Sequence, residues 1–112
     1  IDLGDGRMLV FADEPDVAIY QNNMPQVAVE VKGGIDPAGV LERIGAALKS
    51  LQRTRQDNPN SVTVLILHDV SMTERAKEDL NLSTGTVTYL FSAKAILEDE
   101  TERERFFRIL GI

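Results

Sequence analysis

The stretch that decides the fold is residues 16–32, DVAIYQNNMPQVAVEVK, which predicts a β-hairpin. Residues 16–20 are rich in strand-favouring types, and the polar residues 21–25 predict a turn. Residues 26–32 alternate strictly between apolar and other side chains, which is typical of a strand with one buried face. The apolar face of this second strand carries Val27, Val29 and Val31.

The hairpin predicts a pair of facing carboxylates. With the turn centred on Asn23, residues whose numbers sum to 46 lie opposite each other, and Asp16 then faces Glu30 with Cβ atoms about 5 Å apart. Such a like-charge pair is destabilising unless a cation such as Mg²⁺, which carboxylate oxygens hold, neutralises it. Lys32 shares the face of Glu30 and adds an ammonium group. Two acids and a lysine on one face predict a phosphodiesterase site.

A plainer interpretation of the same residues stays open. Glu14 and Lys32 also sum to 46, so they can pair in a solvated surface ladder, while Asp16 is an ordinary turn residue after Pro15. The hairpin register and the apolar alternation around Glu30 favour the functional site. The glycines at 33 and 34 favour a close approach to a metal or to backbone rather than a phosphate loop, because the P-loop spacing is missing.

The rest of the chain alternates strands and helices and predicts an α/β fold. Asp36 and Pro37 begin a helix with an N-cap and a proline in its first turn, and Thr101 with Glu104 predicts a capping box. The expected elements are strands at 7–12, 16–20, 26–32, 62–67 and 86–91, and helices at 37–56, 73–81 and from 101 onward. A strand–helix–strand crossover predicts parallel neighbours. We expect a mixed β-sheet core of β-β-β-α-β order flanked by helices, as one domain over residues 1–112.

In the residues of this hairpin and the elements that follow it, the chain resembles the PD-(D/E)XK nuclease superfamily. The match consists of Pro15-Asp16, thirteen intervening residues, and Glu30-Val31-Lys32 on consecutive strands, followed by a helix and a buried strand. The resemblance implies a restriction-endonuclease-like fold and Mg²⁺, with Mn²⁺ as a substitute, held by Asp16, Glu30 and the main-chain carbonyl of Val31. It implies Lys32 beside the attacking water, and hydrolysis of double-stranded DNA. Residues 30–50, EVKGGIDPAGVLERIGAALKS, are similar to type II restriction endonucleases of the XcyI kind.

The resemblance leaves the biological role open among three expectations. The first is a metal-dependent endonuclease core of restriction type. The second is a structure-specific nuclease that acts in repair or resolves junctions. The third is a non-catalytic assembly module that keeps the nuclease fold.

Further residues are candidates for DNA contact or for support of the site. Glu42, Arg43 and Lys49 lie off the apolar stripe of the helix at 37–56 and can reach the site or a phosphate, unless they form a solvated face. His68 follows the buried strand at 62–67, where it can bind DNA or simply mark the end of the strand. The candidates for DNA contact or indirect support are therefore Glu14, Glu42, Arg43, Lys49 and His68.

Composition limits the other possibilities. The 112 residues are 43% hydrophobic and include no cysteine, which excludes a disulfide scaffold and a thiolate metal site. No apolar run approaches the roughly 20 residues of a membrane span, and we expect a cytoplasmic protein without a membrane partner. The chain begins at Ile1 and lacks the acidic helix that precedes the first strand in many of these nucleases, so we expect a piece of a longer polypeptide with a truncated N-terminus.

The net charge of −6 is low for a protein that binds nucleic acid. Residues 1–36 hold seven acids and two bases, several of them around the predicted metal site, whereas residues 37–60 hold four bases and two acids. A bound cation offsets part of the acidity locally. Because phosphate-binding charge is still scarce, we expect a homodimer or a larger polypeptide to supply more of the DNA-binding surface.

Overall fold

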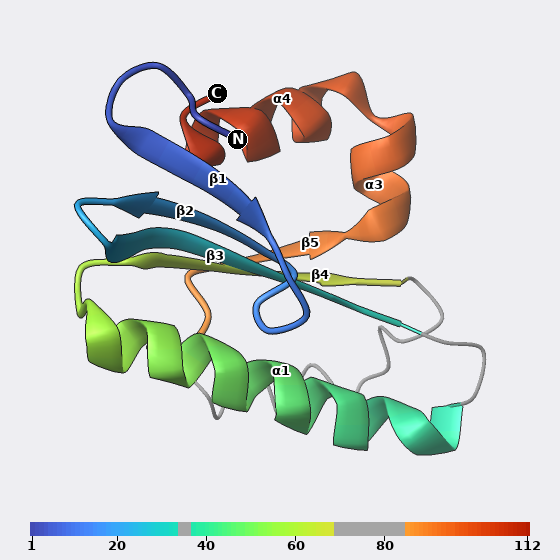
Figure 1. The fold of residues 1–112 in the computed structure, drawn as a ribbon. Coiled ribbons are helices and arrows are strands. Elements are labelled where there is room, and N and C mark those ends of the chain that lie inside the picture. Colours follow the sequence, from blue (N-terminus) through green and yellow to red (C-terminus); the bar gives the residue numbers. More distant parts are fainter. Residues whose placement is uncertain (34–36, 69–84) are drawn as a thin grey trace.

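The computed structural model describes residues 1–33, 37–68 and 85–112 of the chain, and its centre is a five-stranded mixed sheet (Figure 1). The strands lie side by side in chain order, and the first three are antiparallel to one another. β4 pairs in parallel with β3, and β5 pairs in parallel with β4. The strands are β1 (Arg7–Phe11), β2 (Val17–Gln21), β3 (Met24–Lys32), β4 (Val62–Leu67) and β5 (Tyr89–Ser92).

Helices cover both faces of this sheet. α1 (Pro37–Asp57) connects β3 to β4 and packs along one face, while α3 (Ala93–Glu98) and α4 (Glu100–Leu110) follow β5 and pack on the other (Figure 1). The predicted α/β architecture and the parallel pairing of β3 with β4 are therefore confirmed. The helix predicted at 73–81 lies outside the described residues.

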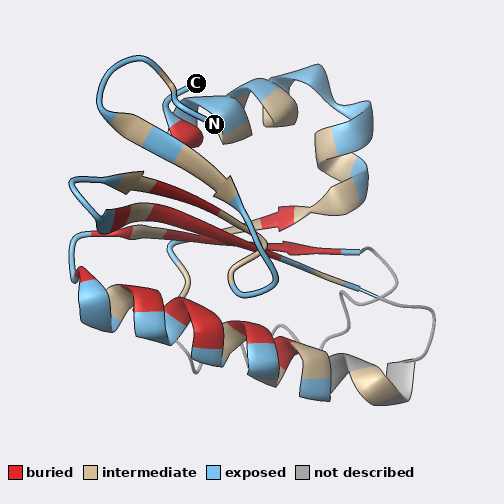
Figure 2. Cartoon of the chain, in the orientation of Figure 1, coloured by how far each residue is buried: buried red, intermediate tan, exposed pale blue. Residues whose placement is uncertain are grey.

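The core consists of two apolar layers, one on each side of the sheet (Figure 2). The layer beneath α1 is formed by Ala28, Ile44, Ala47, Leu51, Leu65 and Leu67. The layer beneath α3 and α4 includes Ile19, Val27, Val29, Val64, Ile66, Phe91 and Leu110. Each large side chain buried in these layers stabilises the fold by about 1.5–3 kcal/mol. Because neighbouring strand residues point to opposite faces, the valines of β3 face α4 and the residues between them face α1.

The hairpin turn differs from the prediction. The predicted five-residue turn at 21–25 is wrong, because the chain reverses in two residues, Asn22 and Asn23, whose φ angles are 53° and 61°. Asparagine tolerates this left-handed backbone better than other non-glycine residues. A register shift between Ile19 and Tyr20 then restores the predicted pairing, and Val17 lies opposite Val29.

The C-terminal helices begin differently from the prediction. Thr101 is not the cap, because the side chain of Asp99 accepts hydrogen bonds from the N–H groups of Thr101 at 2.9 Å and Glu102 at 3.3 Å. The short helix α3, capped by Ser92, precedes α4 and was not predicted. Of the two aromatic residues on α4, Phe106 packs edge-on against Phe91 with ring centres 5.6 Å apart, whereas Phe107 is 42% exposed.

Candidate functional site

Glu30 is a carboxylate inside the apolar layer between the sheet and α1. Glu30 is 0% exposed, and Leu65 lies beside it on β4. Neither of its carboxylate oxygens accepts a well-formed hydrogen bond from the described residues. A charged group in such a position costs several kcal/mol unless a counter-charge compensates it. Glu30 must therefore be compensated by a neighbouring positive charge or take up a proton.

Asp16 lies opposite Glu30, as the hairpin register predicts. It directly precedes β2, and the pairing of Val17 with Val29 places the two acids across from each other. The Oδ2 atom of Asp16 accepts a hydrogen bond of 2.7 Å from the N–H of Val31, which fixes the carboxylate beside the end of β3. The N–H and C=O of one residue point to the same side of an extended strand, so the carbonyl of Val31 also faces Asp16.

Lys32 completes the group from the same face of β3. Its Nζ lies 3.5 Å from Oε2 of Glu30 and forms an ion pair with it, although no hydrogen bond joins them. The lysine side chain is 25% exposed, so its ammonium group keeps contact with solvent at the end of the strand. The structure therefore brings Asp16, Glu30 and Lys32 together, with the backbone of Val31 between them.

The environment shifts the protonation of Glu30. Burial raises the pKa of Glu30 above its ordinary value of 4.5, and the neighbouring Asp16 carboxylate also raises it. The Ser50 hydroxyl and the Lys32 ammonium act in the opposite direction without cancelling the effect of burial. A divalent cation held beside Glu30 would favour its charged form.

Ser50 is the part of this environment that the sequence did not reveal to us. It lies on α1, is 4% exposed, and approaches Glu30 from the helix. Thr54, one turn later, is also buried and donates a hydrogen bond to the carbonyl of Ser50 at 3.4 Å. Both polar residues interrupt the apolar stripe of the helix around Leu51, and that interruption is the signal that identifies them.

Glu14 takes a different partner from the one in the surface-ladder alternative. Its carboxylate pairs with Nη2 of Arg53 on α1 at 3.1 Å, and both side chains are about half or more exposed. The suggested ladder between Glu14 and Lys32 is therefore wrong, because Lys32 is paired with Glu30. An exposed ion pair of this kind contributes about 0–1 kcal/mol.

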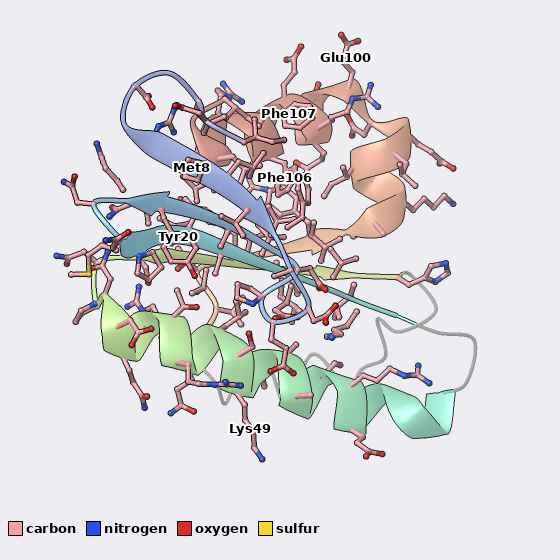
Figure 3. The ribbon with its side chains drawn as sticks, viewed as in Figure 1. Met8, Tyr20, Lys49, Glu100, Phe106 and Phe107 are labelled. Carbon is pink, nitrogen blue, oxygen red and sulfur yellow. The ribbon has the colours of Figure 1, made fainter. Side chains whose placement is uncertain are left out.

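The three candidates on α1 occupy different surroundings. Nη1 of Arg43 donates a hydrogen bond of 3.2 Å to the carbonyl of Gly33, directly after Lys32, so Arg43 does reach the end of β3. Lys49 is exposed and points away from the sheet (Figure 3). Glu42 is exposed, and none of the contacts within the described part of the chain joins it to Asp16 or Glu30.

His68 lies at the end of β4, on the face opposite to Glu30. Leu67 belongs to the layer under α1, so the next residue points toward α3, and His68 borders a hollow of about 260 Å³ there with Leu97. Its N–H donates to the carbonyl of Lys32 at 3.1 Å. A Cβ on Gly33 would lie 2.5 Å from the Cβ of His68 and 3.4 Å from its backbone nitrogen, so Gly33 does allow a close approach of another strand end, whereas Gly34 lies outside the described residues.

The site contains two carboxylates and one main-chain carbonyl, and no cluster of three or more His, Cys, Asp or Glu ligands occurs among the described residues. None of the helices in that part of the chain is long and apolar enough to span a membrane. Comparison of the chain with protein-family models, with curated proteins and with solved structures gives no match. The geometry of Asp16, Glu30 and Lys32 is therefore the ground for a functional proposal.

Proposed function

We propose that this chain is the core of a Mg²⁺-dependent endonuclease that hydrolyses phosphodiester bonds in double-stranded DNA. The observation that carries the proposal is Glu30, a fully buried carboxylate whose oxygens accept no well-formed hydrogen bond from the described residues, placed opposite Asp16 and 3.5 Å from Lys32. Stability of the fold offers no reason for a buried acid that faces a second acid at the edge of the apolar layer, whereas a cation site does.

The residues present fit a magnesium ion. Its ligands would be Asp16, Glu30 and the main-chain carbonyl of Val31, because Mg²⁺ prefers carboxylate and carbonyl oxygens and completes its shell with water and substrate phosphate. Neither oxygen of Glu30 accepts a well-formed hydrogen bond from the described residues, and the N–H of Val31 donates to Asp16, so the carbonyl of Val31 lies on the same side of the strand. When bound, the ion supplies positive charge and Lewis acidity at the phosphate.

Lys32 is suited to the chemistry of the attacking water. Its partly exposed ammonium group can hold a water molecule by a hydrogen bond and can stabilise negative charge as it develops on the phosphate. Glu30 holds this ammonium at the end of the strand, and Asp16 is held there by the N–H of Val31. Lys32 therefore acts on the water, while the two acids would hold the ion.

The arrangement of elements also supports a restriction-endonuclease-like fold. Asp16 directly precedes β2, and the residues from Glu30 to Lys32 end the neighbouring antiparallel strand β3; α1 and the parallel strand β4 follow them. This is the order on which the resemblance to PD-(D/E)XK nucleases depends. Because a net charge of −6 leaves little positive charge for phosphate, other surfaces in a homodimer or a longer polypeptide would provide additional contacts to DNA.

A DNA cleavage assay tests this proposal. The chain is incubated with linear, supercoiled and branched duplex DNA in Mg²⁺, in Mn²⁺ and in a chelator. We expect metal-dependent cutting that falls by about a hundredfold or more in Asp16→Asn and in Lys32→Met. The matched control is Asp13→Asn, which removes an exposed acid from the same loop and should cut normally.

The outcomes separate the alternatives. Preference for branched over linear DNA would indicate a junction or repair nuclease instead of a restriction enzyme. Equal cutting by the wild type and both site variants, or cutting that persists in the chelator, would refute the proposed site.

A further inference from the structure

Arg43 is placed at the site by a specific contact. It lies in the second turn of α1, and its Nη1 donates to the carbonyl of Gly33 at 3.2 Å. Gly33 directly follows Lys32, so the guanidinium group lies at the carboxyl end of β3, which is the same end of the fold as the start of α1 (Figure 1). The contact joins the helix after the site to the strand that carries it.

Gly39 provides the space for this guanidinium group. It lies four residues before Arg43 and therefore on the same side of the helix. A Cβ at position 39 would lie 2.9 Å from Nη2 of Arg43, which is too close, so any other residue would displace the end of the arginine side chain. A glycine near the start of a helix lowers its intrinsic stability. Its presence is explained if the position of the guanidinium group matters.

Among the described residues, Arg43 uses little of its hydrogen-bonding capacity. A guanidinium group has five N–H donors, and the contacts of the described residues occupy only the one that reaches Gly33. No carboxylate of the described residues forms an ion pair with it, in contrast to Arg53, which is paired with Glu14. The side chain is only partly buried, so a ligand can reach it.

We propose that Arg43 binds one backbone phosphate of the DNA, next to the phosphodiester that Lys32 serves. The inference rests on the proposed nuclease function and adds to it a residue that binds the DNA backbone beside the site. A planar, permanently charged fork with free N–H groups is suited to two phosphate oxygens. The hydrogen bond to Gly33 fixes the guanidinium group before DNA binds, and Gly39 leaves the space that this position needs. The fixed position lowers the entropy lost on binding.

A purely structural role for Arg43 gives different expectations. If the side chain only fastens α1 to the end of β3, its removal lowers stability and leaves the salt dependence of DNA binding unchanged. A phosphate contact instead contributes to the number of counterions that DNA releases. The slope of log Kd against log salt therefore distinguishes the two roles.

The test is fluorescence anisotropy with a labelled 20-base-pair duplex, with Ca²⁺ in place of Mg²⁺ to prevent cutting, between 50 and 200 mM KCl. Arg43→Gln should weaken binding by about tenfold or more and reduce the salt slope by about 0.9. The matched control is Arg108→Gln, which removes the same charge from an exposed position on α4 and should stay within about twofold of the wild type.

Gly39→Ala is the second variant, and it keeps every charge. Alanine favours the helix, so the melting temperature should rise, while the displaced guanidinium group weakens DNA binding. If Arg43→Gln binds with the same affinity and slope as Arg108→Gln, or if Gly39→Ala binds like the wild type, the phosphate site is refuted. Cutting by the wild type would then leave the nuclease proposal standing, whereas a wild type that neither binds nor cuts DNA would refute both.

Discussion

Replacement of Glu30 by glutamine should stabilise the protein when no divalent cation is present. The carboxylate is 0% exposed, neither oxygen is hydrogen-bonded by described residues, and Asp16 faces it. Burial of this charge costs several kcal/mol. The Coulomb attraction to Lys32 at 3.5 Å offsets this cost by roughly 5 kcal/mol at an effective dielectric constant of 20. Solvent around the lysine screens part of that attraction. We expect Glu30→Gln to raise the free energy of unfolding at pH 8 by about 1–2 kcal/mol.

Addition of Mg²⁺ should reverse the order of the two proteins. A cation at one hundred times its dissociation constant stabilises the wild type by about 2.7 kcal/mol, because it binds only the folded site. Glu30→Gln lacks one of the ligands and should gain little. The assay is urea unfolding followed by circular dichroism, in a chelator and in Mg²⁺ at matched ionic strength.

Two results would refute this reasoning. If Glu30→Gln loses more than about 1 kcal/mol in the chelator, the carboxylate is a net stabilising partner of Lys32 and calls for no cation. If Mg²⁺ stabilises Glu30→Gln as much as the wild type, the ion binds elsewhere. Asp13→Asn is the control for general effects of removing an acid, since Asp13 is exposed in the same loop.

Three other predictions follow from single contacts. Because the pKa of Glu30 is raised in the fold, the metal-free wild type should lose stability as the pH rises above about 4.5, and Glu30→Gln should not. Urea unfolding from pH 4.5 to 8 measures the free energy of unfolding of both proteins. An increase in this free energy with pH for the wild type relative to the variant would contradict the prediction. Gly33→Ala should cost about 1–3 kcal/mol, because its Cβ would lie 2.5 Å from that of His68, and unchanged urea stability would argue against this close approach. Arg7→Ala should cost about 1–2 kcal/mol, since the guanidinium group donates to the last carbonyls of α4 and its C-cap at 3.2 and 2.9 Å; a melting temperature equal to that of the wild type would show that this cap is not needed.

The hairpin shows how far the sequence could predict the site. Alternation in β3 and the central asparagines were enough to place Asp16 opposite Glu30, although the turn itself is shorter than predicted. The prediction holds near the site because the register shift after Ile19 compensates for the shorter turn. Such a compensation depends on how the strands pack, and the pattern of a single strand does not contain it.

The residues outside the hairpin were harder to predict for a different reason. Whether a residue belongs to the site depends on the face of the sheet to which its side chain points. A shift of one position along a strand moves the side chain to the other face. His68 therefore lies on the α3 side although its neighbour Leu67 lies under α1. Ser50 and Arg43 depend on how α1 is rotated against the sheet, which the full set of packed side chains determines.

The most direct test of the central claim is a crystal structure of the wild-type chain with Mn²⁺, with data collected at the manganese absorption edge. We expect one anomalous peak about 2.0–2.2 Å from an oxygen of Asp16, an oxygen of Glu30 and the carbonyl oxygen of Val31. Absence of a peak at these three groups, with Glu30 still paired to Lys32, would refute the proposed metal site.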